Sequence, residues 1–177
     1  LNLKLAGYDT LVIHGKAEKP VYLYISSEDI EIKDASDLWG KDVRETHNTL
    51  IKTYGNEVDT AAIGPAGENL VKFAAIMVSV YNAAARAGGG AVMGSKNLKA
   101  IVVKGDGKLE VARPDEFYDL VMKVREKLRR DKAAQNGGKY GTSATFADFN
   151  ELRAVPYKNF QINYVDRSIA WRYDGRH

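Results

Sequence analysis

Alternating apolar and polar positions early in the chain predict a β-hairpin. Residues 21–25 alternate aliphatic with tyrosine side chains, which is the two-residue period of a strand with two distinct faces. The polar run at residues 26–29 favours a turn, and isoleucines then alternate with Glu and Lys at residues 30–33. Short apolar runs predict further strands at residues 11–13, 61–63, 70–77 and 101–103.

Within this strand-rich region, one segment changes to the period of a helix. The apolar face of residues 42–54 is made by Val43, His47, Leu50 and Tyr54. Gly55 provides a stop, because glycine readily adopts the left-handed conformation that commonly ends a helix. Residues 64–67 read Gly-Pro-Ala-Gly, which predicts a tight turn directly after a short strand.

The last third of the chain favours helices. Pro114 opens an amphipathic helix whose apolar face is made by Phe117, Leu120, Val121, Val124 and Leu128. The Gln-Asn-Gly-Gly run at residues 135–138 is expected to break this helical region, and a second helix is expected at about residues 143–152.

This change of pattern predicts an α+β fold class with two parts. We place the boundary between residues 105 and 113, so that a β-rich domain over residues 1–110 precedes the beginning of an all-α domain over residues 111–177. Both ends of the chain read as the interior of folded elements. We therefore expect an internal fragment of a longer polypeptide, truncated in its helical domain.

Composition excludes several classes of protein. The chain has 26 basic and 23 acidic residues, a net charge of +3, which is too balanced for the concentrated basic face that nucleic acid requires. It has no cysteine, which excludes thiolate catalysis and cysteine-ligated clusters within these residues. No apolar run approaches the roughly 18 residues that cross a bilayer, and no signal sequence is visible. We therefore expect a cytoplasmic protein without membrane attachment.

The segment that carries chemistry runs from Arg86 to Ala91 and contains three consecutive glycines. Each glycine costs about 0.5–1 kcal/mol against alanine in regular structure, so the run favours close backbone approach to a ligand or positive φ. A glycine loop that opens a short helix at residues 91–98 is a generic anion site. Arg86 adds a planar cation for a phosphate or a ring oxygen. The alternative is a glycine-rich turn or a tight packing site.

Two nucleotide-binding motifs fail in this region. The phosphate-binding loop needs Gly-Lys-Ser or Gly-Lys-Thr, whereas residues 94–96 read Gly-Ser-Lys. The dinucleotide fingerprint needs a glycine at position 93, where this chain has Met93. Residues 64–69, Gly-Pro-Ala-Gly-Glu-Asn, form a second candidate site, for which a rigid turn is the simpler interpretation. The histidines lack partners at metal-ligand spacing and are interpreted as ordinary polar residues: His14, His47 and His177.

An ordered set of segments resembles the aldehyde ferredoxin oxidoreductase family. The resemblance is strongest over residues 86–100, which end Gly-Ala-Val-Met-Gly-Ser-Lys-Asn-Leu-Lys-Ala. The other matching segments are residues 5–9, 13–22, 34–41, 63–69, 139–142 and 156–161. Each short peptide is weak evidence for the family by itself, but the ordered set of segments covers nearly the whole chain.

The resemblance implies an oxidoreductase that converts aldehydes to carboxylic acids and passes two electrons through an iron–sulfur cluster to ferredoxin. The implied cofactors are tungsten or molybdenum held by two pterins, and a 4Fe-4S cluster whose ligands lie outside this chain. A homo-oligomer is compatible with this family. Residues 1–110 would be the later part of the N-terminal pterin-binding domain, and residues 111–177 the start of the next, helical domain.

Carried over by position, the resemblance implies a set of cofactor contacts but no catalytic residue and no metal ligand. The expected contacts to a pterin or its phosphate are Arg86, Ala87, Gly88, Gly89, Gly90 and Ala91. The sequence departs from the family at Ala87 and Ala85, where glycine is usual, and at residues 78–82, where a polar run with an arginine is expected. If position 87 needs positive φ, alanine costs about 1 kcal/mol or more there.

Other functions stay open at this point. One is the pterin-bearing subunit of a related aromatic acyl-CoA reductase; another is a non-catalytic module that binds an anion or nucleotide through the glycine loop; a third is an inactive remnant. The match at residues 64–69 and the Tyr-Gly-Thr at residues 140–142 favour the aldehyde branch.

Overall fold

The computed structural model describes all residues from 1 to 177 and divides into two compact units. We call Leu1–Glu110 the sheet unit and Val111–His177 the helical unit. The expected α+β class is confirmed, because one unit is built on a mixed sheet with helices and the other is helical. That the first unit is a cofactor-binding domain, and the second the start of another domain, stays a prediction.

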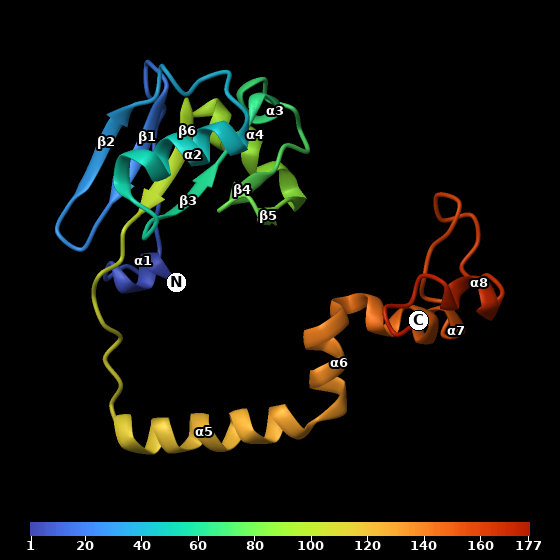
Figure 1. Cartoon of the computed structure of the whole chain (residues 1–177). Coiled ribbons are helices and arrows are strands. Elements are labelled where there is room, and N and C mark those ends of the chain that lie inside the picture. The colour runs from blue at the N-terminus through green and yellow to red at the C-terminus, as the bar shows by residue number, and fades with distance from the viewer. The chain divides into compact units, whose positions relative to one another are not determined.

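A single six-stranded sheet organises the sheet unit, with strand order β2-β1-β6-β3-β4-β5 (Figure 1). The strands are β1 (Val21–Ile25), β2 (Ile30–Asp34), β3 (Asp59–Ala62), β4 (Ile76–Val78), β5 (Asn82–Ala84) and β6 (Leu98–Val103). β1 and β6 run parallel, and every other neighbouring pair is antiparallel. The expected hairpin is confirmed by the pairing of β1 with β2.

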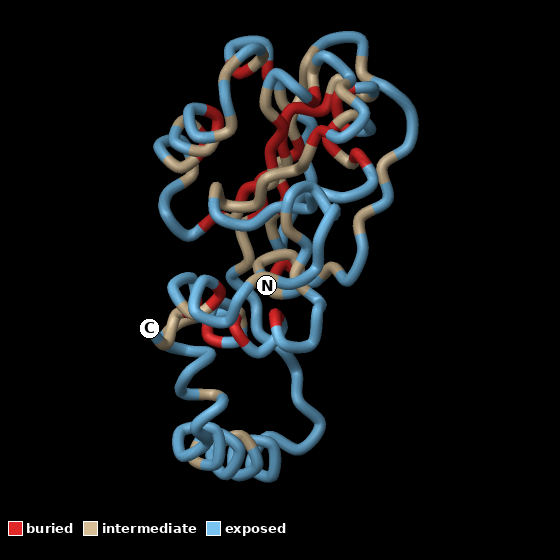
Figure 2. Tube along the Cα trace, turned by 90° about the vertical axis from the view of Figure 1, so that its right-hand side faces the viewer, coloured by how far each residue is buried: buried red, intermediate tan, exposed pale blue.

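The strand β6 lies between two layers of apolar side chains. On one side, Ala100 and Val102 pack in a cluster with Leu50. On the other side, Leu98 and Val103 pack in a cluster with residues of β1 and of the first 13 residues of the chain. Figure 2 shows that the buried residues of this unit concentrate along the sheet. This alternation along β6 explains why its residues are nearly all buried.

Four helices belong to the sheet unit: α1 (Asn2–Leu5), α2 (Val43–Tyr54), α3 (Pro65–Glu68) and α4 (Gly89–Ser95). The predicted helix at residues 42–54 is confirmed as α2. Its start is fixed by a reciprocal cap, in which the Asp42 carboxylate accepts from the Glu45 N–H at 2.8 Å and the Glu45 side chain accepts from the Asp42 N–H. Gly55 ends it with φ 90°.

Three of the predicted elements in this unit are wrong. Residues 11–13 form no strand; Leu11 and Ile13 pack on the core as an irregular segment. Only the end of the apolar run 70–77 enters a strand, because β4 begins at Ile76. The Gly-Pro-Ala-Gly run is one helical turn, α3, since Pro65 occupies its first position, where a missing N–H does no harm.

The helical unit contains α5 (Pro114–Arg130), α6 (Lys132–Tyr140), α7 (Phe146–Glu151) and α8 (Arg167–Trp171). The amphipathic helix from Pro114 is confirmed, although no α5 residue is buried within this chain. The expected break at residues 135–138 is wrong, because α6 runs through both glycines. The Asp131 carboxylate starts α6 by accepting from the Ala134 N–H at 2.8 Å, so the break falls at Asp131 instead.

A buried polar network holds the last part of the helical unit. The Asn150 side chain donates to the Val165 carbonyl at 2.9 Å and accepts from the Tyr157 hydroxyl at 2.9 Å. The buried Asp174 carboxylate accepts from the Ala147 N–H and from the Arg176 guanidinium. The hydrogen bonds from Arg176 lower the pKa of Asp174 well below its usual range.

Candidate functional site

The candidate segment Arg86–Ala91 begins directly after the edge strand β5. Arg86 opens a short 3₁₀ turn that passes into α4 at Gly89. The Arg86 side chain is exposed, and no ion pair of the chain includes it. Beside it stand Ala85 and Ala87, both exposed and neither with a side chain beyond Cβ. The two residues that flank this free guanidinium in the chain therefore carry only methyl side chains.

Two of the three consecutive glycines are required by packing inside the protein. A Cβ added to Gly88 would lie 2.1 Å from the Lys72 carbonyl oxygen, and one added to Gly90 would lie 2.6 Å from the Ala75 carbonyl oxygen. Both approaches are too close for any side chain. Gly89 is less constrained, since its added Cβ would meet only the end of the Ile76 side chain at 3.2 Å. The tight-packing interpretation is therefore correct for Gly88 and Gly90.

The backbone N–H groups that were expected to bind an anion at the start of the helix are only partly available. The helix begins at Gly89, two residues earlier than expected, and the Gly90 N–H donates to the Ala74 carbonyl at 2.9 Å. That backbone donor is therefore already used within the protein. A ligand at this segment would depend mainly on the Arg86 guanidinium and on close approach to the exposed backbone of Ala87.

Three residues in the segments that depart from the expected pattern have positive φ. Ala87 has φ 69° and ψ 8°, in the left-handed region that costs a non-glycine residue roughly 1–2 kcal/mol. In the turn between β4 and β5, Ser79 and Val80 also have positive φ, at 46° and 69°. For a β-branched residue such as Val80 this conformation is a genuine outlier.

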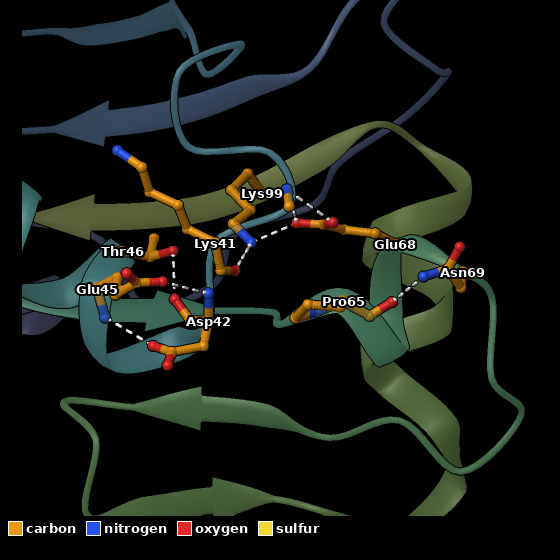
Figure 3. A network of polar contacts seen from close by, with 9 residues as sticks. Lys41, Asp42, Glu45, Thr46, Pro65, Glu68, Asn69 and Lys99 are labelled. Atoms are coloured by element: carbon orange, nitrogen blue, oxygen red, sulfur yellow. Dashed lines mark hydrogen bonds and ion pairs between the residues drawn. The ribbon is translucent and has the colours of Figure 1, made fainter.

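The second candidate, residues 64–69, forms α3 and its ends, and a buried ion pair lies there (Figure 3). The Glu68 carboxylate pairs with the Lys99 ammonium, and their side chains are 5% and 0% exposed. Lys99 was not among the residues singled out in the sequence. The available signal was a lysine in an otherwise apolar strand, which needs a buried counter-charge nearby.

The remaining candidates were the histidines, of which His47 lies on a helix that packs against the sheet. Nδ1 of His47 lies 2.7 Å from the hydroxyl of Thr60, on the sheet face that α2 covers. No group of three or more His, Cys, Asp or Glu side chains is arranged to hold a metal ion. No helix of the chain is long and apolar enough to cross a membrane.

Comparison with known proteins identifies the family. Residues 1–105 match the family model described as the N-terminal domain of aldehyde ferredoxin oxidoreductase. The tungsten-containing aldehyde ferredoxin oxidoreductases of Pyrococcus furiosus and Thermococcus kodakarensis are 55% and 51% identical over 161 and 168 residues. The chain belongs to the aldehyde ferredoxin oxidoreductase family, which confirms the resemblance seen in the sequence.

The matches cover most of this chain but little of each relative. The Pyrococcus furiosus alignment spans 90% of this chain and 27% of the relative, so the chain corresponds to about a quarter of that protein. An aliphatic sulfonate oxidoreductase subunit from the same organism is 38% identical. Among solved structures, the BamBC active-site complex of benzoyl coenzyme A reductase matches with a TM-score of 0.72 and 32% identity, over 97% of this chain and 28% of that chain.

Proposed function

We propose that this chain is the part of an aldehyde-oxidising enzyme that holds one side of its pterin cofactor. The observation that carries the proposal is the free guanidinium of Arg86 beside the exposed, side-chain-poor backbone at Ala85 and Ala87. A pterin cofactor carries a phosphate and a flat ring system. An unpaired arginine suits the phosphate, and a surface without long side chains lets the rings approach the backbone.

Within this proposal the expected contact set of Arg86, Ala87, Gly88, Gly89, Gly90 and Ala91 divides into residues that reach the cofactor and residues that seat the segment. Arg86 pairs with the phosphate. The backbone at Ala87 and the partly exposed Gly89 lie against the cofactor, whereas the buried Gly88 and Gly90 let the segment seat on residues 72–75. The segment therefore binds and orients the cofactor and performs no proton transfer itself.

The reaction we assign to the whole protein is oxidation of an aldehyde to a carboxylic acid. Water supplies the added oxygen, and two protons and two electrons leave the substrate; ferredoxin is the proposed acceptor of the electrons. Tungsten or molybdenum bound by two pterins would supply the redox chemistry at the substrate. A 4Fe-4S cluster would need ligands from outside residues 1–177, because this chain has no cysteine. A cytoplasmic location and a homo-oligomeric state stay predictions.

The similarity to benzoyl coenzyme A reductase supports one alternative, reduction of an aromatic acyl-CoA. The 55% identity to an aldehyde ferredoxin oxidoreductase, against 32% for the reductase, favours the aldehyde reaction. The test is to purify the complete natural polypeptide from cells grown with tungstate and molybdate, and to assay aldehyde-dependent reduction of ferredoxin. Aldehyde turnover supports the proposal. Reduction of benzoyl-CoA without aldehyde oxidation would support the alternative, and a metal-free protein active on neither would favour the binding module or the remnant.

A further inference from the structure

The buried ion pair of Glu68 and Lys99 joins three separate segments of the sheet unit. Glu68 is the last residue of α3, and Lys99 lies in β6. The Glu68 carboxylate also accepts from the Gly40 N–H at 2.9 Å, and the Lys99 ammonium donates to the Lys41 carbonyl at 2.7 Å. Figure 3 shows the two side chains meeting between α3 and the strand. Both charged groups are thus paired and hydrogen-bonded.

A buried ion pair is not required for packing between α3 and β6, because apolar side chains could occupy the same volume. Removing two charges from water carries a large desolvation penalty, and apolar residues of similar volume often give equal or greater stability. A buried pair does, however, impose a defined distance and direction on the segments that carry it. One feature of the fold depends directly on the position of α3.

That feature is α4, which begins within the candidate site. Gly67, next to Glu68 in sequence, faces α4 with its backbone. A Cβ added to Gly67 would lie 2.9 Å from the Gly90 carbonyl oxygen, and one added to Gly94 would lie 1.9 Å from the Gly67 carbonyl oxygen. With no side chain between them, the two helices touch backbone to backbone. A displacement of α3 would therefore be transmitted directly to Gly90 and to the segment that starts at Arg86.

We propose that Glu68 and Lys99 are positioning residues for the cofactor segment: their ion pair fixes α3, and α3 fixes the place of Arg86–Ala91. This inference rests on the proposed function of that segment. The proposed role is indirect, since both side chains are buried and the pair is not exposed at the surface of the segment. We therefore expect substitutions of Glu68 or Lys99 to reduce cofactor retention. In metal sites, loss of a residue that hydrogen-bonds to a metal ligand weakens metal binding about 10- to 100-fold.

The experiment uses the complete natural polypeptide and the variants E68Q, K99M and E68Q/K99M. Two quantities are measured for each: the pterin and tungsten or molybdenum content per folded polypeptide, and the midpoint of thermal unfolding after the cofactor is removed. Each single variant leaves one buried charge unpaired and is expected to lose both stability and cofactor. The double variant removes both charges, so its stability should return towards that of the wild type, while its cofactor content stays about 10-fold lower.

Recovery of both stability and cofactor content in the double variant would overturn the proposal, because only the unpaired charge would then have mattered. If the double variant does not fold, E68D decides the question. It keeps both charges but is one methylene shorter, so that reduced cofactor content in folded E68D supports the proposal and wild-type content overturns it. R86A, measured in parallel, separates this inference from the proposed function. Full cofactor content in R86A contradicts the site itself, whereas loss in R86A with full content in E68Q/K99M contradicts only the positioning role.

Discussion

Gly94 of α4 lies against the backbone carbonyl of Gly67 in α3, so closely that a Cβ at position 94 would stand 1.9 Å from that oxygen. No side chain separates the two helices at this point, and the carbonyl cannot move without displacing α3. The contact connects two candidate segments that are separate in the sequence, residues 64–69 and residues 86–100. Both lie beside the central strand β6, with Glu68 paired to its Lys99.

Substitution of Gly94 by alanine is therefore expected to destabilise the sheet unit by about 3 kcal/mol, since the added methyl group must push backbone rather than a flexible side chain. Urea unfolding followed by circular dichroism measures the change. Gly89→Ala, in the same helix, is the matched control. Its added Cβ meets only the end of the Ile76 side chain. A similar loss in both variants would mean that glycine is needed throughout α4 for another reason.

Helix α6 provides a test in the opposite direction. Gly137 and Gly138 lie within this helix, and a Cβ added at either position would meet nothing within 4 Å. Gly137→Ala should therefore stabilise the helical unit by about 0.5–1 kcal/mol, because alanine has less backbone freedom to lose on folding. The free energy of unfolding in urea is the relevant measurement. Destabilisation would show that α6 does not persist through these glycines.

Strain at position 87 predicts that Ala87→Gly stabilises the protein. Alanine at φ 69° costs roughly 1–2 kcal/mol, and the greater freedom of glycine in the unfolded chain offsets part of the gain. The expected net increase in stability is about 0.5–1 kcal/mol. Ala91→Gly, within α4, is the control and should lower stability by about 1 kcal/mol. Equal losses for the two changes would argue against a left-handed conformation at Ala87.

The helical unit should lose stability in acid through Asp174. Because the Arg176 guanidinium lowers the pKa of Asp174 in the folded state, its stabilising effect is full above the ordinary carboxyl pKa of about 4. It disappears as the pH falls from there through the depressed folded value. Asp174→Asn should be less stable than wild type at neutral pH, and the difference should shrink below about pH 4.

Trp171 is a suitable probe for this comparison, because the Arg176 guanidinium lies 5.4 Å from its ring centre. Trp39 is the only other tryptophan, so Trp39→Phe provides a background in which fluorescence reports the helical unit alone. Urea midpoints of the Asp174→Asn variant and its parent are then measured from neutral pH downwards. A difference that stays constant into acid would show that Asp174 does not titrate with folding.

Much of the secondary structure could be predicted from local pattern. The β1–β2 hairpin and α2 follow from period and capping, which are properties of neighbouring residues. Residues 11–13 could not be predicted in this way, because Leu11 and Ile13 pack on the core without joining the sheet. Gly137 and Gly138 wrongly predicted the end of a helix. Each glycine weakens a helix, but the Asp131 cap and the other residues of α6 outweigh that cost.

Arg86 and the glycine run stand out in the sequence by their composition, and their role as cofactor contacts stays a prediction. Which glycines serve packing could not be read from sequence, since Lys72 and Ala75, whose carbonyls they meet, belong to a different segment. The pairing of Glu68 with Lys99 likewise depends on tertiary structure that local pattern does not encode.

The proposed binding of the cofactor by Arg86 is tested by measuring the cofactor content of R86A. Arg44 is the only other arginine in the sheet unit; it is exposed on α2 and takes part in no ion pair, so R44A is the matched control. Both variants of the complete natural polypeptide are purified from tungstate-grown cells, and pterin and metal are quantified per folded polypeptide. We predict that R86A retains about 10-fold less of both than wild type, whereas R44A retains the wild-type amount. Equal and full cofactor content in the two variants would show that Arg86 does not bind the cofactor.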